Sequence, residues 1–530
     1  MDKEQHQSKD ESMAHGSSNN SPTQPFEPLT MNESKRVPNL RWFVIIMSHL
    51  VLFSVTVVVS SLSLTIVAMV RVEAKSSEEA EAECMKYCNG SYTAMISEIS
   101  SESLKYHVSW SETEKDYMLE AVFWGALISS PIGGRIGELL GPRRSVSLCL
   151  IAISVLNLLF APAALINYWV AFVIRLVQGI GQGIVMPSLY VVVSRWSTDH
   201  ERTLSNAVVQ SGIAMANIVV HPFVGLLISN ESANNWPSIF YYISLLNLAV
   251  FCFWYLIVYD FPETHPYLSK EELDYIALNR SFKPGVSKIV PWTRLMSSPP
   301  VIAYLCVSFT YGWLISTVST QIPSFYKEIL GLSFEANGLL NALPWILSLI
   351  ISLTAGYAAD RVCRTSSVSL TKLRKLLAFL GLGSGSIGIL LITCYDWDKK
   401  SIVSLVTLSK GFATLNIAGP GTSHLDISPS YAGTLAGIYN LFFNLSALIM
   451  NHSVATIVGD YPTQQKWFTF FRLTSGLNII GLILFIIMGS AQVQPWDPSY
   501  EPSPVNFATP LNLDFNYQAN MNTFQHTNEN

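Results

Sequence analysis

GGRIGELLGPRR at residues 133–144 decides the fold, because a shorter relative of it, GYAADR, returns at residues 356–361. Each copy has a glycine, an acid four residues later and then basic residues. Each copy also lies at the end of a long apolar segment. A motif that recurs at the same point of two apolar series indicates that the chain is built from two related halves.

Apolar segments fill the middle of the chain and stop near both ends. Half of the 530 residues are hydrophobic, only 13% are charged, and the mean hydropathy is +0.34. Soluble domains carry about 25% charged residues, and a helix needs about 20 mostly apolar residues to cross a bilayer. Segments of that length occur at residues 43–70, 117–138, 145–166, 168–190, 204–228, 236–259, 300–323, 336–358, 374–394, 401–420, 430–455 and 467–489. We therefore expect an all-α membrane protein with twelve transmembrane helices.

Polar stretches divide this series into regions. The predicted regions are a disordered tail (1–41), a six-helix half (42–259), a polar linker (260–299), a second six-helix half (300–489) and a second disordered tail (490–530). Within the linker, Ser269 followed by Glu272 has the spacing of a capping box. This spacing predicts a short helix over residues 269–279.

Several classes of function have no support in the sequence. The first apolar segment is too long for the core of a secretory signal peptide. A net charge of −5 gives no indication of nucleic-acid binding. Histidines and cysteines lack metal-ligand spacing, and no phosphate-binding glycine loop or catalytic constellation is visible. We expect neither an enzyme nor a bound cofactor.

Basic residues indicate how the chain is oriented in the membrane. They collect in the loops after the second, fourth and eighth apolar segments, which share one side, whereas the long loop at residues 71–116 is acidic. The basic residues are Arg135, Arg143, Arg144, Arg195, Arg202, Arg361, Arg364, Lys372, Arg374 and Lys375. Because such loops remain in the cytosol, we expect both termini to be cytosolic.

Two sequons agree with this orientation. Asn89 and Asn230 begin Asn-X-Ser sequences in loops that are assigned to the lumenal or extracellular side, where glycosylation occurs. Cys84 and Cys88 lie in the same acidic loop as Asn89. A disulfide between these two cysteines is chemically permitted there, but two free thiols remain an equal alternative.

The repeated motif also predicts a gate. Gly134 and Gly356 allow two helices to approach closely, while the acids Glu138 and Asp360 can pair with nearby arginines to form cytosolic latches that break and re-form during transport. The alternative is a pair of ordinary basic loops. The further residues assigned to these latches are Arg143, Arg144, Arg361 and Asp426.

Polar residues within the apolar segments are the candidates for a binding site, because charge at membrane depth is costly. Arg175 lies about 10 Å into the fourth segment, Gln182 follows on the same face, and Lys410 occupies a comparable depth in the tenth. Two cations without an accompanying acid would attract an anion, although Lys410 could instead reach toward the interface. Tyr311 could line the same site. His221 could carry a proton, although a histidine satisfied by neighbouring helices is the more common case.

Five further stretches resemble the solute carrier 17 family, which includes vesicular glutamate transporters, sialin and the type I sodium–phosphate cotransporters. They are RLVQGIGQG (175–183), YDFPETHP (259–266), IPSFYKEIL (322–330), NGLLNALPW (337–345) and HLDISPSYAG (424–433). The resemblance covers about residues 40–490 and implies the major facilitator fold. It also implies transport of organic or inorganic anions such as phosphate, glutamate or aspartate, or sialic-acid-like compounds, driven by membrane potential, protons or sodium.

The chain departs from that family at several polar positions, which indicates a divergent member. Gln182 replaces a glutamate that the resemblance implies as a proton carrier, and an amide cannot change its charge. The run at 59–63 lacks the family's first-helix arginine, while Val307 and Leu119 stand at the positions of a seventh-helix arginine and a second-helix histidine.

These departures leave two alternatives to an anion carrier: a carrier of neutral or zwitterionic solutes, and a transport-inactive membrane receptor or trafficking factor. For the leading hypothesis we expect a small-molecule anion as substrate, with a proton or sodium ion possible as the co-transported ion. The other expected partner is the lipid bilayer, with no nucleic acid, and the protein is expected to function as a monomer. The expected location is the plasma membrane or a vesicular or lysosomal membrane.

Overall fold

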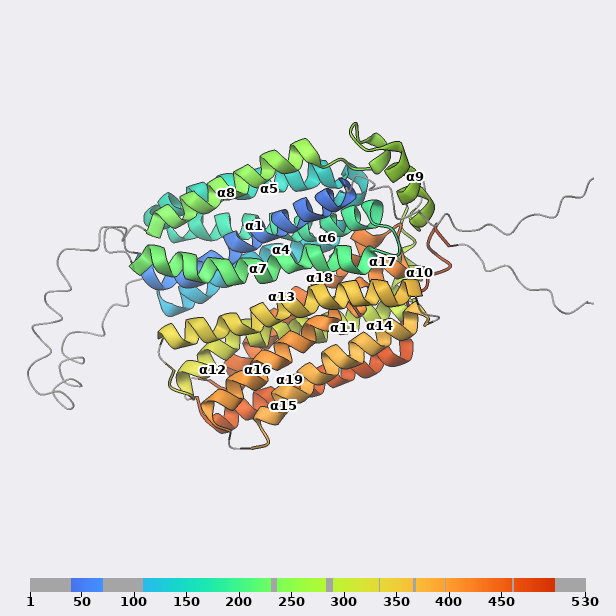
Figure 1. The fold of residues 1–530 in the computed structure, drawn as a ribbon. Helices are drawn as coiled ribbons and strands as arrows, with labels where there is room; N and C mark the ends of the chain where they lie inside the picture. The colour runs from blue at the N-terminus through green and yellow to red at the C-terminus, as the bar shows by residue number, and fades with distance from the viewer. Residues whose placement is uncertain are drawn as a thin grey trace, which may run out of the picture. The chain divides into compact units, whose positions relative to one another are not determined.

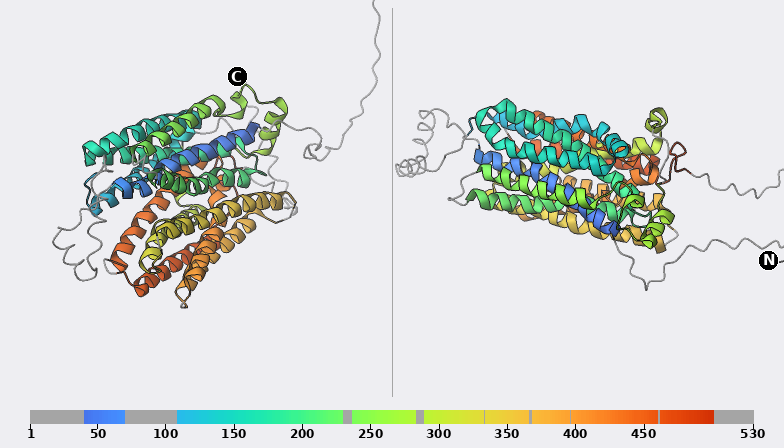
Figure 2. Two further views of the ribbon diagram at one scale, coloured as in Figure 1. Left: turned by 60° about the vertical axis from the view of Figure 1, so that its left-hand side comes forward. Right: turned by 90° about the horizontal axis from the view of Figure 1, so that it is seen from above.

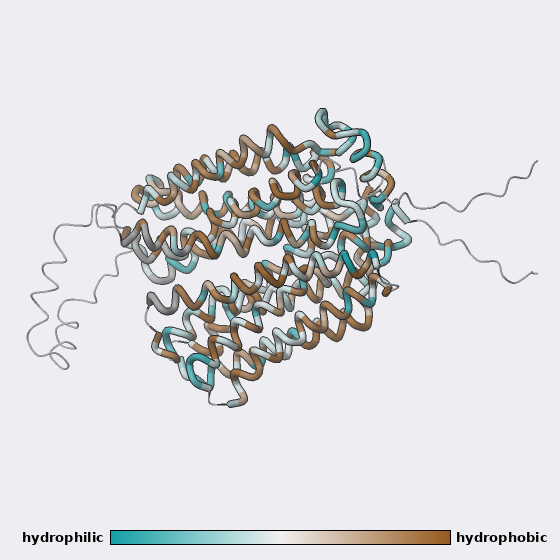
Figure 3. Tube along the Cα trace, viewed as in Figure 1, coloured by the Kyte–Doolittle hydropathy of each residue, from teal (hydrophilic) through white to brown (hydrophobic). Residues whose placement is uncertain are grey.

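The computed structural model describes residues 40–69, 108–229, 236–282, 289–332, 334–365, 368–395, 397–459 and 462–500. Long helices dominate these residues and form two groups, which Figures 1 and 2 show in blue to green and in yellow to red. Hydrophobic residues run along the helices, and hydrophilic residues gather near their ends (Figure 3). This distribution is expected for helices whose sides face lipid and whose ends face water.

The first group contains six helices that begin and end close to the predicted positions. They are α1 (Leu40–Met69), α4 (Glu112–Leu140), α5 (Pro142–Ile166), α6 (Tyr168–Trp196), α7 (Arg202–Ser229) and α8 (Trp236–Ile257). Local sequence fixes several of the ends. Ser111 caps α4 in a reciprocal capping box with Glu114, and the Asn167 side chain accepts hydrogen bonds from the first N–H groups of α6.

The second group also follows the six predicted segments, but three of its segments are interrupted. The elements are α11 (Pro299–Ser316), η3 (Thr317–Gln321), α12 (Ile322–Glu328), α13 (Phe334–Thr365), α14 (Leu370–Ala378), η4 (Phe379–Gly383), α15 (Ser384–Ile392), α16 (Lys399–Ala413), η5 (Thr414–Asn416), η6 (Pro420–Thr422), α17 (Ser423–Ile427), α18 (Ala432–Ile457) and α19 (Gln464–Met488). The π-turns η3 and η4 join helices that continue in one direction. The break at 414–427 leaves backbone carbonyls free for other partners.

Eleven helical segments in the described part of the chain are long and apolar enough to cross a membrane. The helix missing from this set is α4, which corresponds to the second predicted span. Its first turns are acidic, and its later turns are rich in glycine, serine and proline. It nevertheless packs along α6 and α18, so α4 belongs to the bundle.

Most contacts between the two halves come from two helix pairs that are related by the internal repeat, and α6 also packs on α18. In one pair α4 packs on α18, and in the other α7 packs on α13. Glycine permits the closest approach in the first pair, because a Cβ atom on Gly134 would lie 1.9 Å from the carbonyl oxygen of Gly433. One hydrophobic core lies in the first half and also includes Leu425 and Ala432 of the second, and another core lies within the second half.

The linker lies at the end of the bundle where α1 begins, which we call the linker end. It contains η2 (Pro262–Thr264), α9 (Lys270–Asn279) and α10 (Trp292–Met296). The predicted helix after Ser269 is confirmed, and the Ser269 side chain accepts a hydrogen bond from the N–H group of Glu272. The Glu272 carboxylate does not complete a capping box, since it binds the N–H groups of Leu40 and Arg41. This contact fixes the linker to α1.

Residues 490–500 differ from the predicted disordered tail. They pack at the linker end, where Asp497 is buried and Trp496 contacts a hydrophobic cluster. The low hydrophobicity of this segment predicted disorder. The segment is instead held by specific hydrogen bonds, which cannot be predicted from hydropathy.

Candidate functional site

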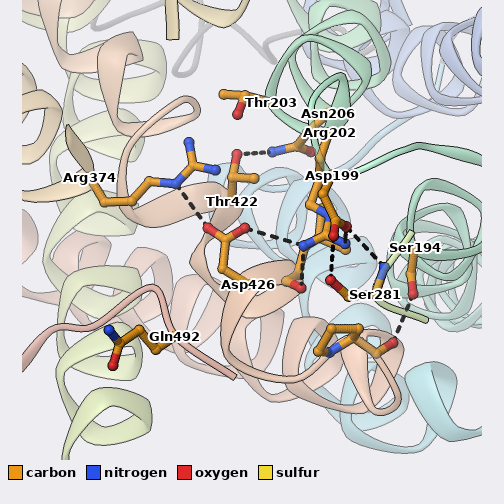
Figure 4. Close-up of polar contacts among 12 residues, drawn as sticks. Ser194, Asp199, Arg202, Thr203, Asn206, Ser281, Arg374, Thr422, Asp426 and Gln492 are labelled. Atoms are coloured by element: carbon orange, nitrogen blue, oxygen red, sulfur yellow. Dashed lines mark hydrogen bonds and ion pairs between the residues drawn. The ribbon is translucent and has the colours of Figure 1, made fainter. Parts of the chain in front are cut away.

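An acid between two arginines connects the halves at the linker end. Asp426, at the end of α17, accepts a hydrogen bond from Nε of Arg374 at 2.9 Å and forms an ion pair with Arg202 of α7 at 3.4 Å. Figure 4 shows Asp426 between the two guanidinium groups. Arg202 also donates to the carbonyl of Leu425 at 3.0 Å and pairs with Asp199. All three central side chains are buried, so the second half is tied to α7 of the first half.

The two acids of the repeated motif cross the interface in a symmetric way. Glu138 of α4 accepts hydrogen bonds from the N–H and hydroxyl groups of Thr434, both at 2.7 Å, in the first turn of α18. Asp360 of α13 accepts hydrogen bonds from the N–H groups of Thr203 and Leu204, at 3.2 and 2.8 Å, in the first turn of α7. Each acid therefore satisfies free N–H groups at the start of a helix in the other half, where the helix dipole also favours negative charge.

The arginines of the motif have other surroundings. The guanidinium group of Arg143 donates to the carbonyl of Tyr255, while Arg144 and Arg361 are exposed. Arg135 forms an ion pair with Glu138 at 2.8 Å along α4. The bonds that cross between the halves at this motif are therefore made by the carboxylates.

Arg175 is buried within the first half. Its guanidinium group donates to Oε1 of Gln178 at 2.9 Å and to the carbonyls of Val58 and Val59 in α1. The carbon of that group lies 5.7 Å from the centre of the Phe160 ring in α5. No ion pair to Arg175 is present within the described residues, and its Nε atom has no partner there.

Lys410 has a comparable position in the second half. Its Nζ atom lies 4.3 Å from the centre of the Trp345 ring in α13, and the side chain is buried. The described part of the chain supplies no acid to it. The structure does not bring Lys410 and Arg175 together, because the contacts of each cation come from its own half.

Four buried tyrosines meet between the halves. Tyr190 comes from α6, Tyr304 and Tyr311 come from α11, and Tyr439 comes from α18. The rings of Tyr304 and Tyr439 lie 4.8 Å apart between centres. The Phe443 ring lies between Tyr311 and Tyr439, with ring centres 6.3 and 6.5 Å away from theirs. The side-chain amide of Gln210 in α7 donates to the Tyr190 hydroxyl.

His424 of α17 joins this tyrosine cluster. Its ring centre lies 4.4 Å from that of Tyr190, across the interface, and 5.7 Å from that of Tyr304. The imidazole is fully buried, and neither of its nitrogens has a hydrogen-bond partner in the part of the chain described here. The backbone of Gly421 lies beside the ring without hydrogen-bond geometry. Within the described residues, His424 therefore adds two unpartnered ring nitrogens to the tyrosine cluster.

The structure describes the side chain of only one of the remaining predicted site residues, Gln182. Gln182 is half-buried, with an Oε1 atom that lacks a partner among the described residues. The His221 side chain lies outside the described residues, as do Cys84, Cys88, Asn89 and Asn230. The described residues contain no group of three His, Cys, Asp or Glu side chains that could hold a metal ion.

The sequence indicated Tyr311 as a residue that could line a binding site, but it did not indicate that Tyr190, Tyr439 and His424 belong to the same cluster. Their separation in sequence hides the cluster, since they come from three different helices. One signal was available. The glycines and proline at 419–421 interrupt an apolar segment, and interrupted helices in transporters mark binding sites.

Three kinds of comparison place this chain among known proteins. A sequence model described as Major Facilitator Superfamily matches residues 84–450. The chain is 29% identical to vesicular glutamate transporter 1 of Bos taurus, covering 75% of this chain and 71% of the relative. It is 26% identical to sialin of Homo sapiens, covering 73% and 77%. These relatives confirm the resemblance that the sequence motifs indicated.

Solved structures share the fold at much lower identity. The proton:xylose symporter XylE aligns with a TM-score of 0.59 and 13% identity, covering 84% of this chain and 94% of the other. The Escherichia coli fucose:proton symporter FucP aligns with a TM-score of 0.55 and 13% identity, covering 84% and 98%. At this identity the likeness concerns the fold alone.

Proposed function

Because this chain belongs to the Major Facilitator Superfamily, we propose that it is a secondary active transporter that carries small anions by alternating access. One observation supports the charge of the substrate. Arg175 and Lys410, 1% and 4% exposed, lie on α6 and α16, the fourth helices of their halves, and no acid pairs with either in the described residues. A lone cation in a membrane interior costs about 2.5–3.5 kcal/mol on insertion scales, and a bound anion would offset part of this cost.

The tyrosine cluster supports a site between the halves. Phenol hydroxyls can donate hydrogen bonds to a carboxylate or phosphate, and Tyr190 and Tyr439 belong to helices of opposite halves. An anion held there would experience the positive potential of both buried cations, because charges interact over longer distances where the dielectric constant is low. Gln182 would add an amide but could not carry a proton.

The hydrogen bonds at the linker end support a state that is closed on that side. Asp426, Glu138 and Asp360 each bind a residue of the opposite half. Alternating access requires these contacts to break when the halves rock apart. We assign the linker end to the cytosol, since the basic loops lie there. We further propose a vesicular, lysosomal or plasma membrane as the location, a monomer as the functional state, and coupling to protons or sodium, as the resemblance of the sequence motifs implies.

Uptake into proteoliposomes tests this function. The purified protein would be supplied with radiolabelled phosphate, glutamate or N-acetylneuraminate, and in parallel with neutral and zwitterionic solutes, under imposed voltage, pH and sodium gradients. We expect uptake of one of these anions, reduced at least tenfold in Arg175→Ala and Lys410→Ala. Lys400→Ala is the matched control, because Lys400 is exposed on the same helix as Lys410.

The outcomes separate the alternatives. Full anion uptake in both alanine variants would reject the role of the buried cations. Uptake of neutral solutes alone would favour a carrier of neutral or zwitterionic compounds, and the absence of any uptake would favour a receptor or trafficking factor. Arg175→Lys keeps the charge but loses the planar fork, so it distinguishes a need for charge from a need for the hydrogen bonds of Arg175.

A further inference from the structure

We propose that Asp497 is a positioning residue for the closed linker end, and that residues 491–499 form a strap that holds the turn between α17 and α18 in its closed position. This inference rests on the proposed alternating-access function. We define the turn as residues 428–431. Neither the repeated motif nor the buried cations involve this segment, and Asp497 is its one acidic residue.

The Asp497 carboxylate accepts hydrogen bonds from both the turn and the strap. Its carboxylate accepts hydrogen bonds from the hydroxyls of Ser428 and Ser430, the latter at 2.9 Å, and from the N–H group of Ser499 at 2.7 Å. The side chain is only 3% exposed. Hydrogen bonds to a charged acceptor are about twice as strong as those between neutral groups, so one buried carboxylate fixes the turn against the strap.

Further contacts anchor the strap to the second half. The N–H group of Gln494 donates to the carbonyl of Ile427 at 3.0 Å, and the N–H group of Ala491 donates to Oγ1 of Thr371 at 3.1 Å. The ring of Trp496 packs against the hydrophobic cluster that contains Tyr304 and Tyr439. The strap therefore contacts both the turn and the hydrophobic cluster that includes two of the four tyrosines.

The turn itself contacts the first half. The carbonyl of Pro429 accepts a hydrogen bond from the Ser194 hydroxyl of α6 at 2.8 Å. Just before the turn, Leu425 and Asp426 bind Arg202 of α7. The described contacts of the strap, in contrast, lie in the second half and the end of the linker. Asp497 thus acts through the turn: it holds Pro429 and its neighbours where Ser194 and Arg202 can reach them.

Preorganisation explains why this position would affect the conformational equilibrium. A turn that is fixed before closure loses less conformational entropy when the halves meet. Without the Asp497 carboxylate, the turn would sample more conformations in the open state, and closure would become less favourable. The strap should therefore favour the closed linker end without touching the substrate.

A disulfide cross-link across the interface measures this effect. Asn206 and Thr422 face each other from opposite halves, 2.9 Å apart between Nδ2 and Oγ1 (Figure 4). Cysteines at these two positions, in a full-length chain whose native cysteines are replaced by serine, would form a disulfide when the linker end is closed. We expect Asp497→Ala to lower the closed-to-open ratio about tenfold, which corresponds to about 1.4 kcal/mol.

Matched variants keep the test decisive. Asp497→Asn retains one acceptor oxygen and should give an intermediate ratio, whereas Asp274→Ala removes an exposed acid from α9 and should give the parent ratio. Combining Ser430→Ala with Asp497→Ala should add little to Asp497→Ala alone, because coupled residues are not additive.

An unchanged cross-linking ratio in Asp497→Ala would overturn the proposal. So would a lower melting temperature with the ratio preserved, because that outcome indicates a purely structural role. If Asp497→Ala does not fold, Asp497→Asn and Ser430→Ala carry the same comparison. The assay uses no substrate, so it gives a result even if the protein transports no anion.

Discussion

Two buried cations and a cluster of tyrosines are the interior side chains on which the proposed function depends. Arg175 and Lys410 carry positive charge into the two halves, while the tyrosine cluster offers hydroxyl groups between them. Burial of both cations was predictable from their depth in apolar segments. The residues that contact these cations were not predictable, because Val58 and Trp345 come from helices far away in the sequence. Periodicity reports which residues are buried but not which residues they contact.

His265 of the linker gives a prediction at this scale. Its Nδ1 atom accepts a hydrogen bond from the N–H group of Tyr267, and its Nε2 atom lies 3.1 Å from the carbonyl of Ile257. Only the neutral ring with a proton on Nε2 satisfies both contacts. Burial lowers the pKa of His265 below its ordinary value of 6.5, and the nearby charge of Arg143 adds to this effect.

The sign of the pH effect follows from this lowered pKa. The folded protein holds His265 neutral at pH values where the unfolded chain already binds a proton. The contribution of His265 to stability is therefore present above about pH 6.5 and is lost as the pH falls through the folded-state pKa. We expect His265→Asn to reduce the drop in melting temperature between pH 7.5 and pH 5.5. His200→Asn, at an exposed position, should leave the drop unchanged. An equal drop in the parent and in His265→Asn would contradict the assignment.

Helices were the most predictable elements, since long apolar segments define them. The least predictable was the tenth segment, which the sequence placed at 401–420. The structure breaks it after α16 and resumes it as α17, which ends at Ile427. Pro420 cannot donate a backbone hydrogen bond, so a break there is expected. The groups that satisfy the freed carbonyls come from elsewhere, including Asn206 on Ile417 and Arg374 on Ala418.

The pair of helices α4 and α18 gives a prediction at the scale of elements. A methyl group on Gly134 would collide with the backbone of Gly433, and backbone cannot move aside as a flexible side chain can. Overpacking of this kind costs about 1–3 kcal/mol or more. We expect Gly134→Ala to lower both the melting temperature and the closed fraction measured by the 206–422 cross-link.

Gly476 of α19 is the control for this substitution. A Cβ atom there meets nothing within 4 Å, and alanine stabilises a helix by about 1 kcal/mol relative to glycine. Gly476→Ala should therefore be neutral or stabilising. Equal behaviour of the two alanine variants would show that the close approach of α4 and α18 does not control closure.

At the scale of the whole molecule, the same kind of contact occurs once in each half. Gly134 with Glu138 and Gly356 with Asp360 occupy equivalent places in the two halves, and each acid binds the start of a helix in the opposite half. The repeat itself was visible in the sequence. The partners of Glu138 and Asp360 were not visible in the sequence, because the motif suggested that these acids pair with arginines. Across the interface, the structure instead shows both carboxylates accepting hydrogen bonds from backbone N–H groups.

This symmetry predicts how the two contacts combine. Glu138→Gln and Asp360→Asn preserve shape but remove the negative charge that the helix N-termini favour, an effect of about 0.3–2 kcal/mol at each site. We expect each variant to lower the closed fraction in the 206–422 cross-linking assay. The two contacts share no residue and involve different helix pairs, so the free-energy changes in the double variant should add within about 0.5 kcal/mol. Glu271→Gln, an exposed position on α9, is the control. A double variant no worse than either single variant would indicate that one contact alone holds the halves together, and the symmetric mechanism would then be rejected.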